Sequence, residues 1–179
     1  MRYVALIRGV NISGKNRLPM PELRERCSEL GLSDAVTYLN SGNVAFSAEG
    51  RRAEELAGLL EDMIREKFGL EVPVFVISRD DLKEILDRAP QWWGTGDKDI
   101  YDNLIFVLPP ADVRQICGMI GEPTHGLERI EVCGERAVFW SFDRKKYAKA
   151  NWWKKTAGAG IGEYLTIRTA NTLRKAAEL

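Results

Sequence analysis

The sequence has few of the residues that metal and disulfide sites require. It contains a single histidine, His125, and three widely separated cysteines, Cys27, Cys117 and Cys133, with no Cys-x-x-Cys spacing. Zinc clusters and disulfide frameworks need ligands or cysteine pairs at regular spacings, so we expect no metal and no cofactor. We interpret the cysteines as small apolar core residues. A nucleophilic Cys–His pair that uses His125 is the minor alternative.

An excess of charge of one sign and long apolar runs are also absent. The 26 basic residues balance the 26 acidic residues, so net charge gives no indication of a nucleic-acid or membrane partner. No apolar run reaches the roughly 18 residues of a membrane-spanning helix, and residues 1–10 lack a signal-peptide cleavage site. We therefore expect a cytoplasmic protein with no membrane partner. The sequence does not indicate its oligomeric state.

What the sequence does contain is an order of secondary structure that occurs twice. The first half is expected to form strand, helix, strand, strand, helix and strand at residues 3–8, 19–30, 35–39, 44–46, 52–68 and 72–77. The same order returns at residues 103–108, 111–120, 127–132, 137–142, 144–155 and 164–168, before a last helix at 170–179. This is the order of the split βαβ fold. We predict an α+β protein of two tandem ferredoxin-like βαββαβ halves with antiparallel sheets, plus a C-terminal helix.

A linker is expected between the two halves. A helix predicted over residues 79–88 ends at Pro90, which cannot continue it. The segment that follows, residues 91–101 with Trp92, Trp93 and Gly94, is the candidate linker. We therefore predict an N-terminal half at 1–90 and a C-terminal half at 102–179.

The predicted topology brings two bends of the first half together. In a split βαβ unit, the first and second strands run parallel with the third strand between them. The loop after the first strand, residues 8–16, and the turn at 40–43 must then lie at the same end of the sheet. The loop contains glycines and leads into a helix N-terminus, both of which favour anions. Arg8, Lys15 and Arg17 add positive charge, so the two bends together suit a phosphate or carboxylate.

This pattern is not an established phosphate motif. Neither the P-loop spacing nor the dinucleotide fingerprint occurs. A turn whose Asn and Gly residues only satisfy backbone geometry is the alternative. We find no dedicated base, so we leave open whether the protein is an enzyme; transfer or hydrolysis at a phosphate is the simplest reaction for such a site. The candidate ligand-binding residues are Arg8, Gly9, Asn11, Gly14, Lys15, Asn40, Ser41, Gly42 and Asn43, with Arg168 and Asn171 if the second half folds back near this end.

A second basic segment indicates a different function. Residues 144–155 carry six cations with interleaved aromatic residues, which could stack on the bases of RNA or single-stranded nucleic acid. At helical spacing, however, these cations point in different directions and do not form one stripe. Nucleic-acid binding is therefore our second hypothesis, and a partner-binding protein with no small ligand is the third.

Residues at both ends of the chain resemble one family. Residues 5–16, residues 41–44 and residues 166–168 followed by Asn171 are similar to the motifs of the domain of unknown function 1697 family. The resemblance implies a tandem, ferredoxin-related α+β fold. It brings no established activity and no catalytic residues. The chain departs from the family pattern at Thr169, where the family usually has Asn.

Overall fold

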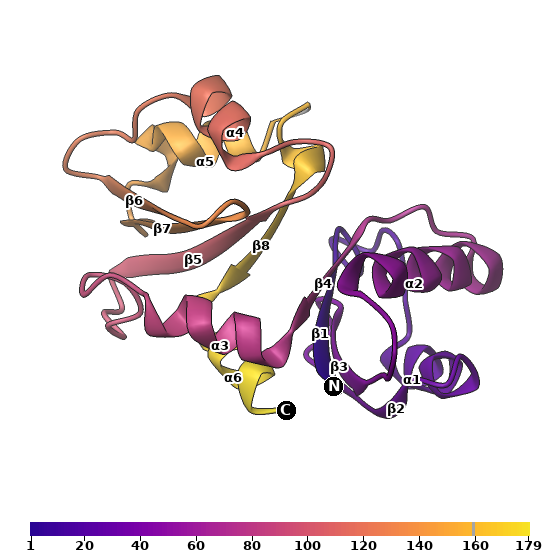
Figure 1. Ribbon diagram of the computed structural model, residues 1–179. Coiled ribbons are helices and arrows are strands. Elements are labelled where there is room, and N and C mark those ends of the chain that lie inside the picture. Colours follow the sequence, from indigo (N-terminus) through magenta and orange to yellow (C-terminus); the bar gives the residue numbers. More distant parts are fainter. Residues whose placement is uncertain (159) are drawn as a thin grey trace. The chain divides into compact units, whose positions relative to one another are not determined.

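Figure 1 shows the computed structural model of the chain, which describes residues 1–158 and 160–179. The chain divides into two compact units, residues 1–84 with 174–179, and residues 85–173. Each unit contains a four-stranded antiparallel sheet, and six α-helices form within the described residues. The α+β class is therefore confirmed. The boundaries predicted from sequence remain a prediction, because a division by packing does not test independent folding.

The first unit has the predicted element order. Its strands are β1 (Arg2–Ile7), β2 (Ser33–Tyr38), β3 (Asn43–Ser47) and β4 (Val74–Ser78), and its helices are α1 (Met20–Glu29), α2 (Ala53–Phe68) and the start of α3 (Arg79–Asp87). The strands are ordered β2-β3-β1-β4. Because β3 is antiparallel to both of its neighbours, β1 and β2 run in the same direction. The loop after β1 and the turn before β3 therefore lie at the same end of the sheet.

One face of this sheet packs against α1 and α2, which lie side by side in Figure 1. Alternate residues of β1 meet apolar residues spaced three or four apart on the helices. These residues include Ala5, Ile7, Leu23, Leu56, Leu60 and Ile64, all fully buried. Cys27 lies in the same core, and burial raises the pKa of its thiol to about 11. The thiol is therefore protonated at neutral pH, as expected for an apolar core residue.

The second unit contains a sheet in the order β6-β7-β5-β8. Its strands are β5 (Ile100–Val107), β6 (Glu128–Cys133), β7 (Ala137–Asp143) and β8 (Leu165–Thr169), and its helices are α4 (Val113–Ile120), α5 (Asn151–Thr156), the start of α6 (Ala170–Glu178) and the short 3-10 helices η1 (Tyr147–Lys149) and η2 (Gly162–Tyr164). The glycines of residues 157–162 predict a loop between α5 and β8, and residue 159 of this range lies outside the described residues. No helix within the described part of the chain is both long and apolar enough to cross a membrane.

Strand β5 begins earlier than predicted, at Ile100 instead of Asn103. Its first three residues, Ile100, Tyr101 and Asp102, pair with β7, whereas the pairing with β8 starts only at Asn103. The start of β5 therefore has a strand neighbour on one side only. Its local sequence is not an apolar run, and pairing with β7 decides its conformation.

A buried carboxylate connects three elements of the second unit. Glu128, at the start of β6, is 6% exposed. Its side chain accepts hydrogen bonds from the backbone N–H of Trp152 at 3.0 Å and from the backbone N–H of Thr124 at 2.9 Å. It also accepts the indole N–H of Trp140 at 3.3 Å and the backbone N–H of Trp153 at 3.4 Å. Glu128 thus satisfies two of the N–H groups in the first turn of α5 and joins this helix to the sheet.

Candidate functional site

The loop after β1 and the turn between β2 and β3 are bonded to one another. The side-chain nitrogen Nδ2 of Asn11 donates to the backbone oxygen of Asn40 at 2.8 Å. The two bends that the topology predicts at one end of the sheet are therefore in direct contact. We call residues 8–18 and 39–43 together the rim.

Asn11 holds the rim in shape. Its Nδ2 donates to the backbone oxygens of Leu18 at 2.9 Å and of Asn40, and its Oδ1 accepts the N–H of Leu18 at 2.9 Å. Asn16 adds a bond from its Nδ2 to the backbone oxygen of Gly9 at 2.9 Å. Because an amide nitrogen carries two donors, both donors of Asn11 are used by the backbone. In this conformation Asn11 positions the loop, and direct ligand contact by its N–H groups would require them to exchange partners.

The tip of the loop is a tight turn. Ile12 and Lys15 form a β-bridge, and the N–H of Lys15 donates to the backbone oxygen of Ile12 at 2.9 Å. Between them, Ser13 and Gly14 have φ angles of 48° and 77°. Two successive left-handed residues are typical of the primed turns that close tight hairpins. The tip is therefore fixed by its own backbone while its side chains remain exposed.

Asn43 and Gly42 shape the turn between β2 and β3. The buried Asn43 donates from Nδ2 to the backbone oxygen of Tyr38 at 2.8 Å and to the hydroxyl of Ser41 at 2.9 Å. Gly42 has a φ of 77°, and a Cβ at this position would lie 2.7 Å from Cγ2 of Val10. Glycine is therefore required for the close approach of the turn to the loop.

The rim carries positive charge and no carboxylate. Lys15 and Arg17 are exposed on the loop, and Arg8 is half-buried directly after β1. Asn40 and Ser41 are exposed on the turn. The sequence of the rim thus holds three cations and no acidic residue, although the whole chain is neutral.

The N-terminus of α1 contributes less to anion binding than the sequence suggests. Pro19 occupies the N-cap, Pro21 lies in the first turn, and no side chain caps the helix. Proline has no N–H to donate, and Glu22 places a negative charge in the same turn. A ligand at the rim would therefore depend on the side-chain cations and on the loop backbone.

Replacing Asn11 by alanine is expected to lower the free energy of unfolding by about 2–3 kcal/mol. Three hydrogen bonds are lost, and alanine tolerates the φ of 55° at this position poorly. Urea denaturation followed by circular dichroism would measure the change. Asn11→Gly also removes the side chain but permits the positive φ, so its free energy of unfolding should be about 1 kcal/mol higher than that of Asn11→Ala. An unfolding midpoint for Asn11→Ala equal to that of the natural sequence would contradict this role.

The two candidate residues of the second unit have different surroundings. Arg168, on β8, donates to the hydroxyl of Thr166 at 3.3 Å and to the backbone oxygen of Ile167 at 3.0 Å. Desolvation lowers the pKa of its guanidinium to about 10. Asn171 is exposed in the first turn of α6 and lines a pocket of the second unit. A contribution of either residue to the rim stays a prediction.

Part of the basic segment at residues 144–155 is paired within the second unit. Lys145 forms an ion pair with Asp99 at 2.8 Å, and Lys146 forms one with Asp143 at 3.6 Å. These exposed pairs reduce the local excess of positive charge. Such pairing weakens the electrostatic basis of the nucleic-acid hypothesis.

The aromatic residues of this segment pack within the second unit. Trp152 is fully buried, with its indole N–H donated to the backbone oxygen of Gly121 at 3.0 Å. Trp153 contacts the rings of Phe142 and Tyr147, with centroid distances of 5.4 and 5.1 Å. Trp152 is therefore unavailable for base stacking, whereas Tyr147 and Trp153 are 45% and 37% exposed. Nucleic-acid binding stays a hypothesis.

Comparison with known proteins gives a family without an assigned activity. The profile described as "Protein of unknown function (DUF1697)" matches residues 1–139. The matched range includes the whole rim and ends before residues 166–171, where the resemblance stays a prediction. A solved structure, that of conserved bacterial protein SP0830 from Streptococcus pneumoniae, is similar with a TM-score of 0.84 and 26% identity, over 99% of this chain and 97% of that one. No curated protein matches the sequence.

Proposed function

Because the chain belongs to the DUF1697 family, which has no known function, we propose from its own geometry that the rim binds a small phosphate-bearing or other anionic ligand. One observation carries this proposal. The loop and the turn, joined through Asn11 and Asn40, present Arg8, Lys15 and Arg17 without a carboxylate among them. A loop that is already ordered by its own hydrogen bonds lowers the entropic cost of placing cations around an anion.

In this proposal the exposed groups of the rim contact the ligand directly. Lys15 and Arg17, with Arg8, supply charge-assisted hydrogen bonds, and Asn40 and Ser41 orient the ligand. The remaining rim residues of the prediction position the backbone or let it approach the ligand. These residues are Gly9, Asn11, Gly14, Gly42 and Asn43.

We also propose that both units are ferredoxin-like. Numbered within each unit, both sheets have the strand order second, third, first, fourth, and both follow the element order βαββαβ. This order and the antiparallel pairing of all neighbouring strands support a tandem arrangement of one fold.

A cytoplasmic location is a further part of the proposal. Its support is the state of the three cysteines, Cys27, Cys117 and Cys133, which are all free thiols. Free thiols are typical of proteins in reducing compartments.

The double variant Lys15→Ala/Arg17→Ala tests the proposed site. We expect it to weaken the binding of inorganic pyrophosphate by about tenfold or more, because each charge-assisted hydrogen bond contributes about 1.5–3 kcal/mol. Isothermal titration calorimetry at low ionic strength would measure the affinity, since salt screens exposed charges. Inorganic phosphate and a nucleoside triphosphate serve as further probes of the ligand class.

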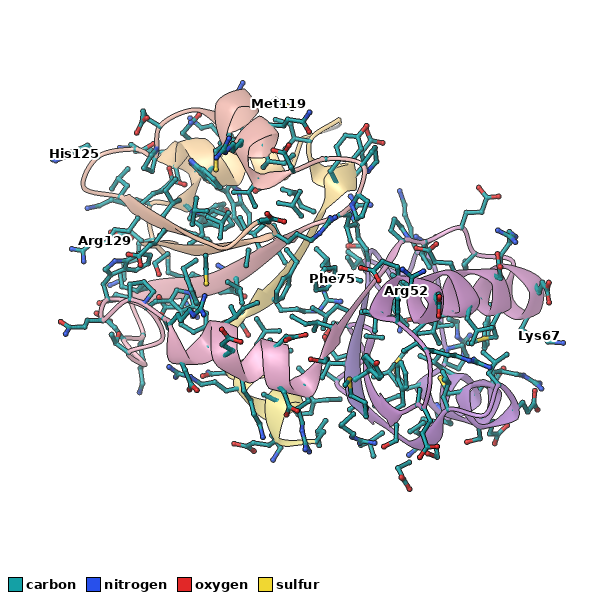
Figure 2. All side chains as sticks on the ribbon, viewed as in Figure 1. Arg52, Lys67, Phe75, Met119, His125 and Arg129 are labelled. Atoms are coloured by element: carbon teal, nitrogen blue, oxygen red, sulfur yellow. The ribbon has the colours of Figure 1, made fainter. Side chains whose placement is uncertain are left out.

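A matched control removes the same charge elsewhere on the first unit. Lys67, which points into solvent from the end of α2 in Figure 2, and Lys83 on α3 are both exposed. Lys67→Ala/Lys83→Ala should change the affinity by less than about twofold, because a remote charge acts only through a screened field. Equal losses in the two double variants would refute a specific site at the rim. The same conclusion would follow if none of these anions bound to the natural sequence.

A further inference from the structure

The second unit contains a pocket of about 440 Å³, lined by both polar and apolar groups. Residues of the linker, the start of β5 and the first turn of α6 line it, together with Arg144. The pocket lies where Ile100, Tyr101 and Asp102 extend beyond the end of β8, which pairs only from Asn103 onward. Its volume is in the range of sites that hold small molecules.

Arg144 is positioned to bind an oxyanion in this pocket. Its backbone N–H donates to the backbone oxygen of Asp99 at 2.8 Å, and its guanidinium lies over the ring of Tyr101, 4.6 Å from the centroid. Within the described chain this guanidinium forms no ion pair with a carboxylate. A guanidinium lying over an aromatic ring keeps its N–H groups available for two parallel hydrogen bonds to a carboxylate.

The lining carries both signs of charge. Lys98 and Arg144 supply two cations, and Asp97 and Asp102 supply two carboxylates. A purely anionic ligand would be repelled by the carboxylates, and a purely cationic ligand would be repelled by the cations. A small zwitterion is attracted by both.

Each lining carboxylate keeps one oxygen for a ligand. Oδ1 of Asp102 accepts the hydroxyl of Ser141, and Oδ1 of Asp97 accepts the backbone N–H of Asp99 at 2.9 Å. The second oxygen of each group has no hydrogen-bond partner among the described residues. Asn171 adds an amide that can both donate and accept.

We propose that this pocket binds a small zwitterion of the amino-acid class. Arg144 holds the carboxylate of the ligand, and Asp97 and Asp102 hold its ammonium group. Asn171 contributes one more hydrogen bond from α6. The site lies within the second unit and does not depend on anion binding at the rim.

Backbone amide NMR spectra of the full chain, titrated with pools of the free L-amino acids, test the proposal. We expect saturable shifts at residues 94–102 and 169–171 and at Arg144 with at least one amino acid. Acetate and methylammonium, which carry one charge each, should bind about tenfold more weakly or worse, because each leaves half of the charged lining without a partner. Acetate binding as strongly as the amino acid would overturn the zwitterion assignment. So would the absence of saturable shifts with every pool at millimolar concentration.

Two variants and one control make the test specific to the pocket. Arg144→Gln and, separately, Asn171→Ala should each weaken the binding, the first by about tenfold or more. Arg114→Gln makes the same change at an exposed position of α4 that does not line the pocket, and it should alter the affinity by less than about twofold. Unchanged affinity in Arg144→Gln would overturn the proposed role of this residue, and with it the site.

Discussion

Glu128→Ala is expected to lower the free energy of unfolding by about 3–5 kcal/mol. The substitution leaves the backbone N–H groups of Thr124 and Trp152 and the indole N–H of Trp140 without their acceptor, in a largely buried environment. Donors buried without a partner cost their full desolvation free energy, and breaking a buried charged interaction costs about this much in total. Urea denaturation monitored by tryptophan fluorescence would measure the loss.

Two further substitutions separate this effect from loss of charge. Glu128→Gln keeps a side chain of the same size with one acceptor oxygen, so it should lower the free energy of unfolding by about half as much as Glu128→Ala. Glu131→Ala removes an exposed carboxylate from the same strand and should change stability by less than about 0.5 kcal/mol. Similar losses for Glu128→Ala and Glu131→Ala would show that Glu128 does not organise the unit.

Gly42→Ala is expected to lower the free energy of unfolding by about 2–5 kcal/mol and to weaken anion binding at the rim. The new Cβ would lie 2.7 Å from Cγ2 of Val10 and 2.9 Å from Cβ of Ile7, and the φ of 77° is unfavourable for alanine. Relief of the contact must push the turn away from the loop, which separates Asn40 from Asn11. Chemical denaturation and the calorimetric affinity for pyrophosphate would measure the two effects.

Gly14 provides a closely matched control for this substitution. It also has a φ of 77°, but a Cβ at Gly14 would meet no atom within 4 Å. Gly14→Ala should therefore lower the free energy of unfolding only by the strain of placing alanine at a positive φ, about 1–2 kcal/mol. If the two alanine variants were equally stable, the contact between turn and loop would not be as tight as described.

The pairing of the two bends could be predicted because it follows from topology alone. Once the first half is recognised as βαββαβ, β3 must lie between β1 and β2, and the two bends share one end of the sheet. The glycine at position 42 also has a local signal, since tight turns need residues with positive φ. The order of strands and helices and the residues of tight turns can both be recognised from short segments of the sequence.

The bonding of individual side chains could not be predicted in the same way. Asn11 has the sequence context of a ligand-binding asparagine, yet its partners Leu18 and Asn40 are fixed only when the chain folds. Glu128 is followed by Arg129 and has the pattern of an exposed strand residue, whereas its donors come from residues far along the chain, such as Trp152. Burial of a charged group is recognisable only from the donors that surround it.

The pocket of the second unit could not be predicted from the sequence for a related reason. Its charged lining residues Asp97, Lys98 and Asp102 are close in sequence, but Arg144 follows β7 far along the chain, and none of them belongs to a recognisable motif. The pocket also depends on the early start of β5, which local propensity does not indicate. The sequence draws attention to Asn171 and, within the basic segment at residues 144–155, to Arg144, but no pattern in it brings the two together.

An amide NMR titration of the full chain with inorganic pyrophosphate at low ionic strength is the decisive test of anion binding at the rim. We expect saturable shifts at residues 8–18 and 39–43, with the strongest effects near Lys15 and Arg17. Shifts of equal size around unrelated exposed cations such as Lys67, or none within the rim, would contradict it.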